Sequence, residues 1–432
     1  MKMANMDDYF DVVIVGTGAA GLYCALNLPA RYRILLLTKQ KADESDSFLA
    51  QGGICMQHGE ADYRPFFDDT MRAGHYENNP ATVDLMIRSS NSIIRDLVRR
   101  GVRFARDDHG ALRFTREGAH SRPRILFHED ITGHEITQTL LNEVLRCENI
   151  ELREHTTLLD FFADASACGG VIAAGPDGEP RAIGAGAVVL ACGGIGGLYK
   201  NSTNFPHITG DAIAMALRHG VACEHLDYIQ IHPTTLYSHR KGRRFLISES
   251  VRGEGALLLD KNGNRFTNEL QPRDVVSAAI RAQMEKDGTD HVWEDMRPIG
   301  EAAIREHFPN ILERCEEEGY DPIHEPIPVV PAQHYFMGGI TAGLSSRTAL
   351  PRLYACGETC CNGVHGRNRL ASNSLLESLV FAQRAADDIL YGEPPVFTGD
   401  KPDLAPYREQ EPLFAAYRQE VLTAIERSKN HE

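Results

Sequence analysis

The 432-residue chain has no apolar run close to the roughly 20 residues that a membrane-spanning helix needs. Its first eight residues carry no apolar signal-peptide core and lead directly into a strand pattern. Basic residues are also in deficit, because 45 Lys and Arg face 60 Asp and Glu and give a formal net charge of −15. Such a charge argues against non-specific binding to nucleic acid. These absences predict a cytoplasmic protein that binds neither membranes nor nucleic acid.

The ten cysteines include no C-x-x-C pair, the spacing that marks many zinc sites and disulfide oxidoreductases. We expect them to be reduced thiols that are mostly buried in the fold. The adjacent pair Cys360-Cys361 leaves a redox or metal role open, but its spacing favours neither. We therefore predict no metal site.

The chain opens with two apolar strand patterns on either side of a glycine-rich turn. A β-branched run ends at Val15, the turn Gly16-Thr17-Gly18-Ala19-Ala20-Gly21 follows, and a helical pattern leads to a second apolar run at 34–37. This order predicts the start of a doubly wound dinucleotide fold, in which the glycines let a pyrophosphate lie at the helix N-terminus. Alone the motif is weak, because glycine-rich turns are often purely structural. The second run ends in Thr38-Lys39, without the acidic residue that normally binds the ribose of NAD, which argues against an ordinary NAD site.

A change of composition divides the rest of the chain. Polar loops, Pro, His and Arg dominate from about 226 to 336, and the dinucleotide-type pattern resumes at 352–358. We therefore predict an α/β fold, with a Rossmann-like nucleotide-binding domain split in sequence and interrupted by an inserted α+β capping domain. The predicted boundaries are 1–225 and 337–398 for the nucleotide domain, 226–336 for the capping domain and 399–432 for a short helical tail. Helical periodicity is found near 79–100, 134–146, 274–286, 300–318 and after Ser374.

A polar loop from Ser45 to Ile54 offers hydroxyl groups, an amide and two glycines. Such a loop can hydrogen-bond the edge of a polar heterocycle while its backbone packs against the ring. A solvated loop without a ligand would have the same composition, so the sequence leaves both interpretations open.

Isolated cations beside Gly or Pro form a second group of candidates. His232 precedes Pro233, Arg273 follows Pro272, and His334 and Arg369 lie in similar contexts. Arginine forks bind carboxylates with two parallel hydrogen bonds, so these residues suit a dicarboxylate. Any one of them is more commonly a surface ion-pair partner or a satisfied buried histidine.

The segment from Thr115 to Arg124 sets one carboxylate, Glu117, among three arginines and a histidine. Its Gly, Ser and Pro residues predict irregular structure. Cations alone would suit a substrate that carries only carboxylates, whereas an added carboxylate suits a substrate that also carries an ammonium group. A solvated ion-pair cluster is the alternative.

These motifs, together with Ala191-Cys192-Gly193-Gly194, Gly210-Asp211 and Gly357-Glu358, resemble in order the flavoprotein family that contains L-aspartate oxidases and the flavoprotein subunits of succinate dehydrogenase and fumarate reductase. The resemblance covers roughly residues 10–395 and implies that the nucleotide is FAD, for which a lysine at the Lys39 position is normal. Succinate dehydrogenases attach FAD to a histidine in the loop before Ala-Gln-Gly-Gly. No histidine precedes Ala50 here, so the resemblance implies non-covalent FAD.

Matched position by position, the family implies the residues that contact each ligand. The FAD contacts are Gly16, Thr17, Gly18, Ala19, Ala20, Gly21, Lys39, Asp46, Ser47, Phe48, Leu49, Ala50, Gln51, Gly52, Gly53, Thr157, Leu158, Gly193, Asp211, Glu358, Ser374 and Leu375. The substrate carboxylates are assigned to His232, His334 and Arg369, with Gln230, Ser248 and Glu249 nearby. Arg273 matches the arginine that transfers a proton in fumarate reduction.

Glu117 separates the members of the family. L-aspartate oxidases share its Thr-Arg-Glu-Gly context, usually with glycine where this chain has Ala119, whereas fumarate reductases and succinate dehydrogenases lack it. The resemblance thus implies oxidation of L-aspartate to iminoaspartate by hydride transfer from Cα to FAD, with reoxidation by O2 or fumarate. Glu117 would bind the ammonium group and orient the Cα–H bond.

The same resemblance implies a place at the start of NAD biosynthesis through quinolinate, with quinolinate synthase as a candidate transient partner. Many members carry a further helical domain at the C-terminus, of which this chain has one helix. Two alternatives remain: a soluble fumarate reductase or succinate dehydrogenase-like enzyme, and a flavin-binding subunit without catalysis.

Overall fold

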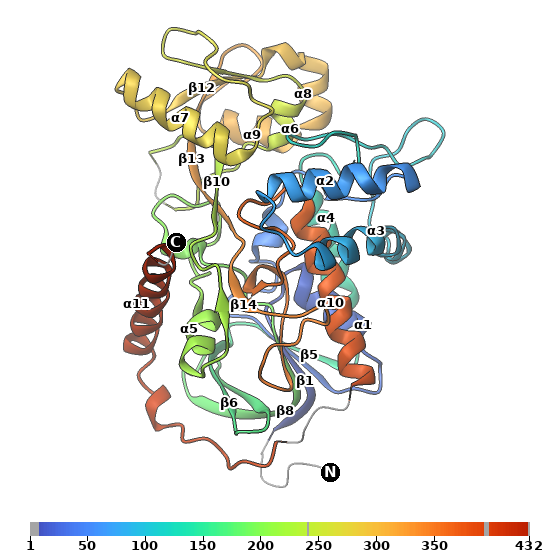
Figure 1. The fold of residues 1–432 in the computed structure, drawn as a ribbon, viewed down its shortest axis with the longest axis vertical. Helices are drawn as coiled ribbons and strands as arrows, with labels where there is room; N and C mark the ends of the chain where they lie inside the picture. Colours follow the sequence, from blue (N-terminus) through green and yellow to red (C-terminus); the bar gives the residue numbers. More distant parts are fainter. Residues whose placement is uncertain (1–7, 240–241, 393–396, 431–432) are drawn as a thin grey trace.

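The computed structural model describes residues 8–239, 242–392 and 397–430 of the chain. Residues 1–7, for which the sequence predicts no export signal, lie outside this part. Figure 1 shows a large sheet with flanking helices in the lower half of the molecule and a smaller sheet with its own helices at the top. The mixture of sheets and helices confirms the predicted α/β class.

The large sheet has seven strands. Its parallel part runs in the order β5-β2-β1-β8, with β15 paired to the end of β8, and β7 and β6 continue it in antiparallel fashion. Because β1 and β2 are covered on both faces, their sequences are nearly continuous apolar runs. The bounds are β1 (Tyr9–Val15), β2 (Ile34–Leu37), β5 (Ile150–Arg153), β6 (Thr157–Ala163), β7 (Cys168–Ala174), β8 (Pro180–Leu190) and β15 (Leu353–Ala355).

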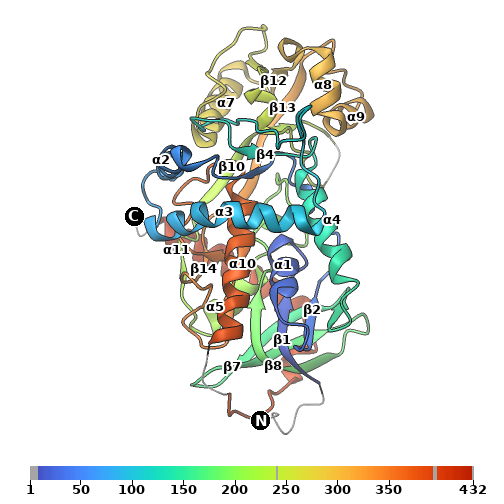
Figure 2. The same cartoon turned by 90° about the vertical axis from the view of Figure 1, so that its right-hand side faces the viewer.

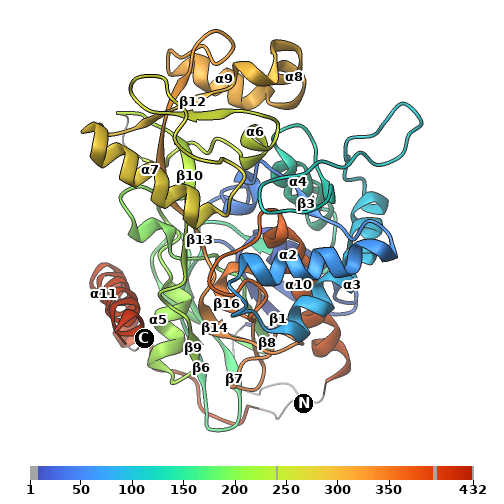
Figure 3. The same cartoon turned by 45° about the horizontal axis from the view of Figure 1, so that its top comes forward.

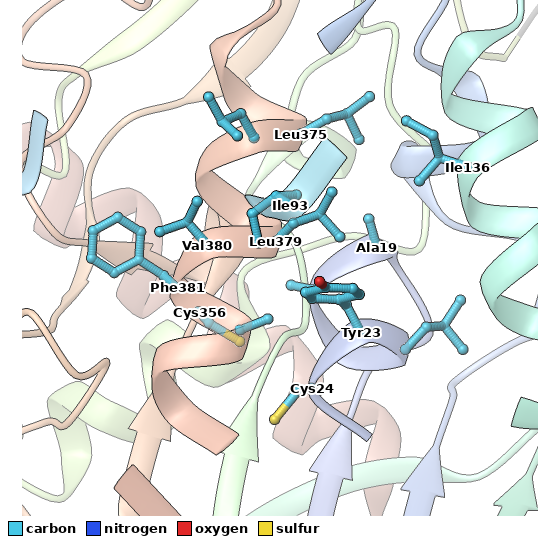
Figure 4. Close-up of a cluster of buried hydrophobic side chains, with 14 of the residues drawn as sticks. Ala19, Tyr23, Cys24, Ile93, Ile136, Cys356, Leu375, Leu379, Val380 and Phe381 are labelled. Atoms are coloured by element: carbon cyan, nitrogen blue, oxygen red, sulfur yellow. The ribbon is translucent and has the colours of Figure 1, made fainter. Parts of the chain in front are cut away.

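Two layers of helices cover this sheet. On one face α1 (Ala19–Asn27) packs beside α10 (Asn373–Tyr391), and α3 (Pro80–Arg100) crosses α10 (Figure 2). Figure 4 shows the core that these helices share, where Tyr23 of α1 lies beside Leu379 of α10. Each large apolar side chain buried there stabilises the fold by about 1.5–3 kcal/mol. The remaining long helices on this side are α2 (Tyr63–Ala73) and α4 (Thr132–Val144).

The opposite face is covered by α5 (Asp211–Arg218) and α11 (Gln410–Lys429), which lie side by side in Figures 1 and 3. Tyr417 and Val421 of α11 are completely buried against this face, and the Tyr417 hydroxyl donates to the Leu159 carbonyl at 2.7 Å. The helix predicted for the carboxyl-terminal segment therefore packs against the sheet.

Residues 229–336, here called the cap, form the smaller sheet and its helices; the other described residues are called the body. The cap sheet is antiparallel in the order β10-β13-β12-β11, and Figure 3 shows α6 and α7 nearer the body than α8 and α9. The bounds are β10 (Ile229–Leu236), α6 (Glu249–Gly253), β11 (Leu257–Leu259), α7 (Arg273–Asp287), β12 (Val292–Asp295), α8 (Glu301–His307), α9 (Pro309–Glu317) and β13 (Ile327–Phe336). Buried residues such as Ile280 and Val329 give the cap its own core. The predicted domain boundaries stay a prediction.

The single helical stretch predicted at 300–318 is two helices, α8 and α9. They separate at Phe308, whose φ of −131° and ψ of 43° are not helical. Proline disfavours a helical conformation in the residue before it and is well suited to the first helical position, which explains both the break and the new start at Pro309.

Small sheets secure the loops of the body. β3 (Ile54–Cys55) pairs with β4 (Ile125–Leu126), while β14 (Gly339–Thr341) lies between β9 (Cys223–Glu224) and β16 (Cys360–Cys361). The adjacent cysteines are therefore buried strand residues, and all ten cysteines are free thiols. Within the described ranges, no helix combines the length and apolar character that crossing a bilayer requires.

Candidate active site

A cavity of about 1700 Å³, counted out to its open mouth, lies between the body and the cap. The loops that follow four parallel strands, β1, β2, β8 and β15, contribute to its wall, among them Gly16, Lys39, Gly193 and Glu358. Open α/β sheets bind ligands at this carboxyl edge. The remaining wall comes from the cap and from the start of α10.

Most of the residues predicted to contact FAD line this cavity. They are Gly16, Thr17, Gly18, Ala20, Lys39, Asp46, Ser47, Leu49, Ala50, Gln51, Gly52, Gly53, Thr157, Leu158, Gly193, Asp211, Glu358, Ser374 and Leu375.

Three predicted contact residues do not line the cavity. Ala19 is buried and its amide donates to the Ser47 hydroxyl at 3.0 Å. Gly21 faces the strand turn, where an added Cβ would lie 1.9 Å from the Gly16 carbonyl oxygen, so it serves the packing of α1 on β1. Phe48 points into the core and meets the His134 ring edge-on. In each case the segment borders the cavity, but the side chain or backbone group faces the protein interior.

Glycine is required at the first position of the turn. Gly16 has φ of +112°, and a Cβ there would lie 2.0 Å from the Ala191 carbonyl oxygen. No other residue fits, because the backbone of β8 passes directly over this position. The turn thus keeps the amino end of α1 open toward the cavity, as binding of a pyrophosphate requires.

Several buried polar atoms along this wall have no hydrogen-bond partner among the residues that the structure describes. They include Ser45 Oγ, Asp46 Oδ2 and Gln51 Oε1. Burial raises the pKa of Asp46 to about 7, so this carboxyl group can act as a donor as well as an acceptor near neutral pH. Unpaired hydrogen-bond donors and acceptors on a wall that includes a dinucleotide-binding turn suit a large polar cofactor such as FAD.

Lys39 is satisfied by a neighbour from a distant segment. Its ammonium group lies 2.7 Å from the Asp211 carboxylate at the start of α5, and it also donates to the His207 carbonyl. The two residues, predicted separately as cofactor contacts, therefore form one ion pair on the cavity wall.

The two histidines predicted for substrate binding occupy bulges of β10 and β13. Gln230 pairs with Tyr335 and Ile231 with Gln333, so His334 is an extra residue on β13; a second irregularity follows His232. Bulges redirect side chains. Both histidines line the cavity, with ring centroids 5.1 Å apart.

Both imidazole rings are kept neutral. Burial, together with the positive charge of Arg273, lowers the pKa of His232 and of His334 well below the ordinary value. His232 Nδ1 contacts the Thr234 backbone, while its Nε2 has no partner in the described part of the chain. His334 Nδ1 contacts the Thr203 hydroxyl at 2.7 Å. Each ring is thus held by one nitrogen.

Arg369 and Arg273 supply the positive charge of the cavity. Arg369 lies over the Tyr335 ring, 4.3 Å from its centroid, and donates to the Ser374 hydroxyl, while its Nε meets no acceptor within the described ranges. Burial lowers the pKa of Arg369 to about 10, so the guanidinium remains charged at neutral pH. Arg273, at the start of α7, forms a short ion pair with Glu249.

Gln230 is not on the wall of the cavity, in contrast to its predicted contact with substrate. Its amide nitrogen donates to Asn368 and to the Arg369 carbonyl, and its oxygen accepts from Arg273 at 2.9 Å. These hydrogen bonds connect the segments that carry Arg273 and Arg369. Gln230 therefore supports the two arginines and does not itself line the cavity. Ser248 and Glu249 do line the cavity.

Glu117 is buried at the cavity wall and does not belong to a solvated ion-pair cluster. Its Oε1 accepts from the Ser250 hydroxyl at 2.8 Å and its Oε2 from the Ser372 hydroxyl at 2.6 Å. Arg124 of the same segment instead pairs with Asp62 and Asp69 of the body. Among the described residues, no ion pair of Glu117 is found.

Ser250 and Ser372 were not singled out from the sequence. Ser372 lies three residues after Arg369 at the start of α10, which is a usable signal. Nothing local marks Ser250, because its partner is 133 residues away.

Comparisons with known proteins agree with this geometry. A family model described as FAD binding domain matches residues 11–375. The L-aspartate oxidase of Clostridium perfringens is 48% identical over 380 residues, which cover 88% of this chain and 86% of that protein. The L-aspartate oxidase of a Nostoc species is 44% identical over 442 aligned positions, covering 98% and 76%.

Among solved structures, the quinol fumarate reductase of E. coli superposes with a TM-score of 0.82 at 30% sequence identity, covering 95% of this chain and 74% of that one. The similarity in sequence and the similarity in fold therefore both indicate an FAD-dependent flavoprotein. The chain belongs to the L-aspartate oxidase family of FAD-dependent flavoproteins.

Proposed function

We propose that this chain is an FAD-dependent enzyme that oxidises L-aspartate to iminoaspartate. The observation that carries the proposal is the buried Glu117 carboxylate in the same cavity as His232, His334, Arg273 and Arg369. A dicarboxylate calls for the cationic and neutral donors, and its amino group calls for the carboxylate.

When bound, FAD would supply the two-electron acceptor for the hydride of the substrate Cα, with O2 or fumarate as the final electron acceptor. The wall around Asp46 and Gln51 would hold it without a covalent bond, because the loop offers no histidine for attachment. The chain contributes binding, orientation and electrostatics.

Arg369, with His334 beside it, would bind one substrate carboxylate. His232 would bind the other: when Nδ1 accepts from the Thr234 amide, Nε2 carries the proton and donates. Ser248 at the start of α6 borders the same region. Fixing two carboxylates leaves the Cα–H bond little rotational freedom, which is a large part of what an enzyme contributes to hydride transfer.

Arg273 would give or take the proton in the fumarate direction. Burial alone would raise the pKa of Glu249, but the guanidinium groups of Arg273 and Arg252 outweigh it and lower that pKa. Glu249 is therefore a permanent anion that holds Arg273 at the cavity wall.

The capping domain proposed for 226–336 would close over the body and exclude water, since the β10 and β13 strands connect the two parts. By the same proposal, the product feeds quinolinate and NAD biosynthesis, with quinolinate synthase as a transient partner. A cytoplasmic location fits the ten free thiols.

Anaerobic mixing of the FAD-loaded enzyme with L-aspartate, D-aspartate and succinate in parallel tests the proposal. We expect L-aspartate to bleach the flavin absorbance rapidly, and the other two compounds to do so slowly or not at all. Faster bleaching by succinate would instead identify a succinate dehydrogenase-like enzyme, and no bleaching by any of them would indicate a flavin-binding protein without this catalysis.

A further inference from the structure

The carboxylate proposed to bind the amino group is held by two hydroxyl groups, one from Ser372, which lines the cavity, and one from Ser250, which does not. Glu117 lies in a loop, and side chains at such positions need support from packed elements to keep one direction. Its backbone rests on α6, where a Cβ added to Gly253 would lie 2.9 Å from the Arg116 carbonyl oxygen. An added Cβ at Gly52 would lie 2.4 Å from Glu117 Oε1, so the carboxylate itself is directed at the loop that borders the cavity.

Ser250 lies on α6, three residues before Gly253, and is buried. Its hydroxyl donates to Glu117 Oε1 at 2.8 Å, and Ser250 does not line the cavity. The Ser248 hydroxyl lies 3.2 Å from the Ser250 hydroxyl, which completes a chain of polar groups from the start of α6 to Glu117. Ser250 thus contacts two residues of the cavity wall, and its shorter hydrogen bond is the one to Glu117.

We infer that Ser250 is a positioning residue for L-aspartate selectivity, because its hydroxyl fixes the direction of the Glu117 carboxylate toward the substrate amino group. This inference rests on the proposed function. A substrate without an amino group makes no use of that direction, so loss of the hydroxyl should affect L-aspartate and fumarate unequally.

The electrostatic surroundings of Glu117 add a second consequence. Burial and the negative charge of Glu249 raise its pKa, whereas the hydroxyls of Ser372 and Ser250 and the charge of Arg273 act in the opposite direction. Cys55 of β3 also faces it. Removing the Ser250 hydroxyl therefore raises the pKa of Glu117 further and leaves less of the ionised form that an ammonium group requires.

The test compares steady-state KM and kcat for L-aspartate oxidation and for fumarate reduction in three FAD-loaded variants between pH 6 and 9. Ser250→Ala removes the hydroxyl and should raise the KM for L-aspartate about tenfold near neutral pH while the KM for fumarate stays within about twofold. The rise in KM for L-aspartate toward acid should also move to higher pH. Ser250→Thr keeps a hydroxyl and should restore both the KM and its pH profile.

Ser90→Ala is the matched control. Ser90 is also buried, in α3, where its hydroxyl donates to the Ile87 carbonyl and accepts from the Gln57 amide, and it does not line the cavity. This variant should lose stability without a change in either KM, which separates a positioning effect from general destabilisation.

An unchanged ratio of the two KM values in Ser250→Ala, or a folded Ser250→Thr that behaves like Ser250→Ala, would overturn the inference while the wild type still oxidises L-aspartate. A wild type that reduces fumarate but does not oxidise L-aspartate would overturn the proposed function and this inference together. The flavin spectrum and thermal unfolding of each variant show which proteins are folded and loaded.

Discussion

Two buried carboxylates of the cavity, Glu117 and Glu249, have opposite pKa shifts although they lie close together. Burial raises the pKa of both, but Glu249 contacts the Arg273 guanidinium, and the net effect is a lowered pKa. The donors that Glu117 meets among the described residues are the hydroxyls of Ser250 and Ser372, and its pKa is raised. Groups whose environments separate their pKa values in this way take different roles in a mechanism. Glu249 is a fixed counter-ion, and Glu117 is available for a cation from the substrate.

Glu117→Gln tests that assignment at the level of one residue. The amide keeps the shape but loses the charge that an ammonium group requires, so kcat/KM for L-aspartate should fall at least about 100-fold, equivalent to about 3 kcal/mol. Fumarate reduction should change less than about fivefold, because fumarate carries no amino group. Both rates come from steady-state assays. Equal losses in the two reactions would mean that Glu117 is structural.

Ala119 makes a different prediction, about stability. It has φ of +65°, a conformation that glycine adopts freely and that costs another L-residue about 1–2 kcal/mol. Glycine loses more entropy on folding, by up to about 1 kcal/mol. Ala119→Gly should therefore raise the free energy of unfolding by up to about 1 kcal/mol, as measured by urea denaturation. A lower free energy of unfolding in this variant would contradict the strain assigned to Ala119.

At the scale of elements, a carboxylate of the body accepts hydrogen bonds from the first turn of a helix in the cap. Asp130, just before α4, accepts from the Asn310 side chain at 2.6 Å and from the Ile311 amide at 2.7 Å, at the first turn of α9. Such caps usually come from the adjacent residue, whereas here the two segments are 181 positions apart. The bond ties α9 to the body.

Asp130→Ala should therefore destabilise the contact between cap and body by about 1 kcal/mol, within the usual range for loss of a helix cap. We expect faster hydrogen exchange in the first turn of α9 and a higher KM for L-aspartate and fumarate alike. Asp130→Asn keeps one of the two acceptor oxygens and should therefore have a smaller effect than Asp130→Ala. Unchanged hydrogen exchange in α9 would show that the attachment of this helix to the body does not depend on the hydrogen bonds of Asp130.

At the scale of the whole molecule, the cap core includes one carboxyl group without a partner. Glu294 of β12 is completely buried, both of its oxygens lack hydrogen-bond donors among the described residues, and burial raises its pKa to about 8. Because the folded-state pKa lies above the unfolded one, near 4.3, folding is favoured while Glu294 is protonated. This contribution is complete at acidic pH and is lost as the pH rises through about 8.

Glu294→Gln removes this titration. The difference in free energy of unfolding between variant and wild type should shift in favour of the variant by about 2–4 kcal/mol between pH 5 and 8.5. Urea unfolding at several pH values measures it, and the subtraction cancels other groups, such as the buried histidines, whose lowered pKa values act below about 6.5. Glu301→Gln, which alters an exposed carboxylate of α8, is the control and should show no such dependence. A pH-independent difference for Glu294→Gln would contradict the prediction.

Local patterns were sufficient for much of the fold. Continuous apolar runs identified β1 and β2, and periodicity identified α3, α7 and α10, because these signals depend only on neighbours along the chain. The turn at Gly16 was predictable for the same reason. The break at Phe308 was missed, although Pro309 carried the signal for it.

The sequence by itself determined the class of fold, the FAD-type turn and the residue types proposed to recognise an amino dicarboxylate, since each is a property of short segments. Only the tertiary structure decided which of these side chains meet. It brought Glu117 to Ser250 and away from Arg124, turned Phe48 and Gly21 inward, and moved Gln230 behind Arg273. The physical reason is that periodicity specifies which face of an element is buried, whereas its partner is chosen by packing and hydrogen bonding between segments far apart in sequence.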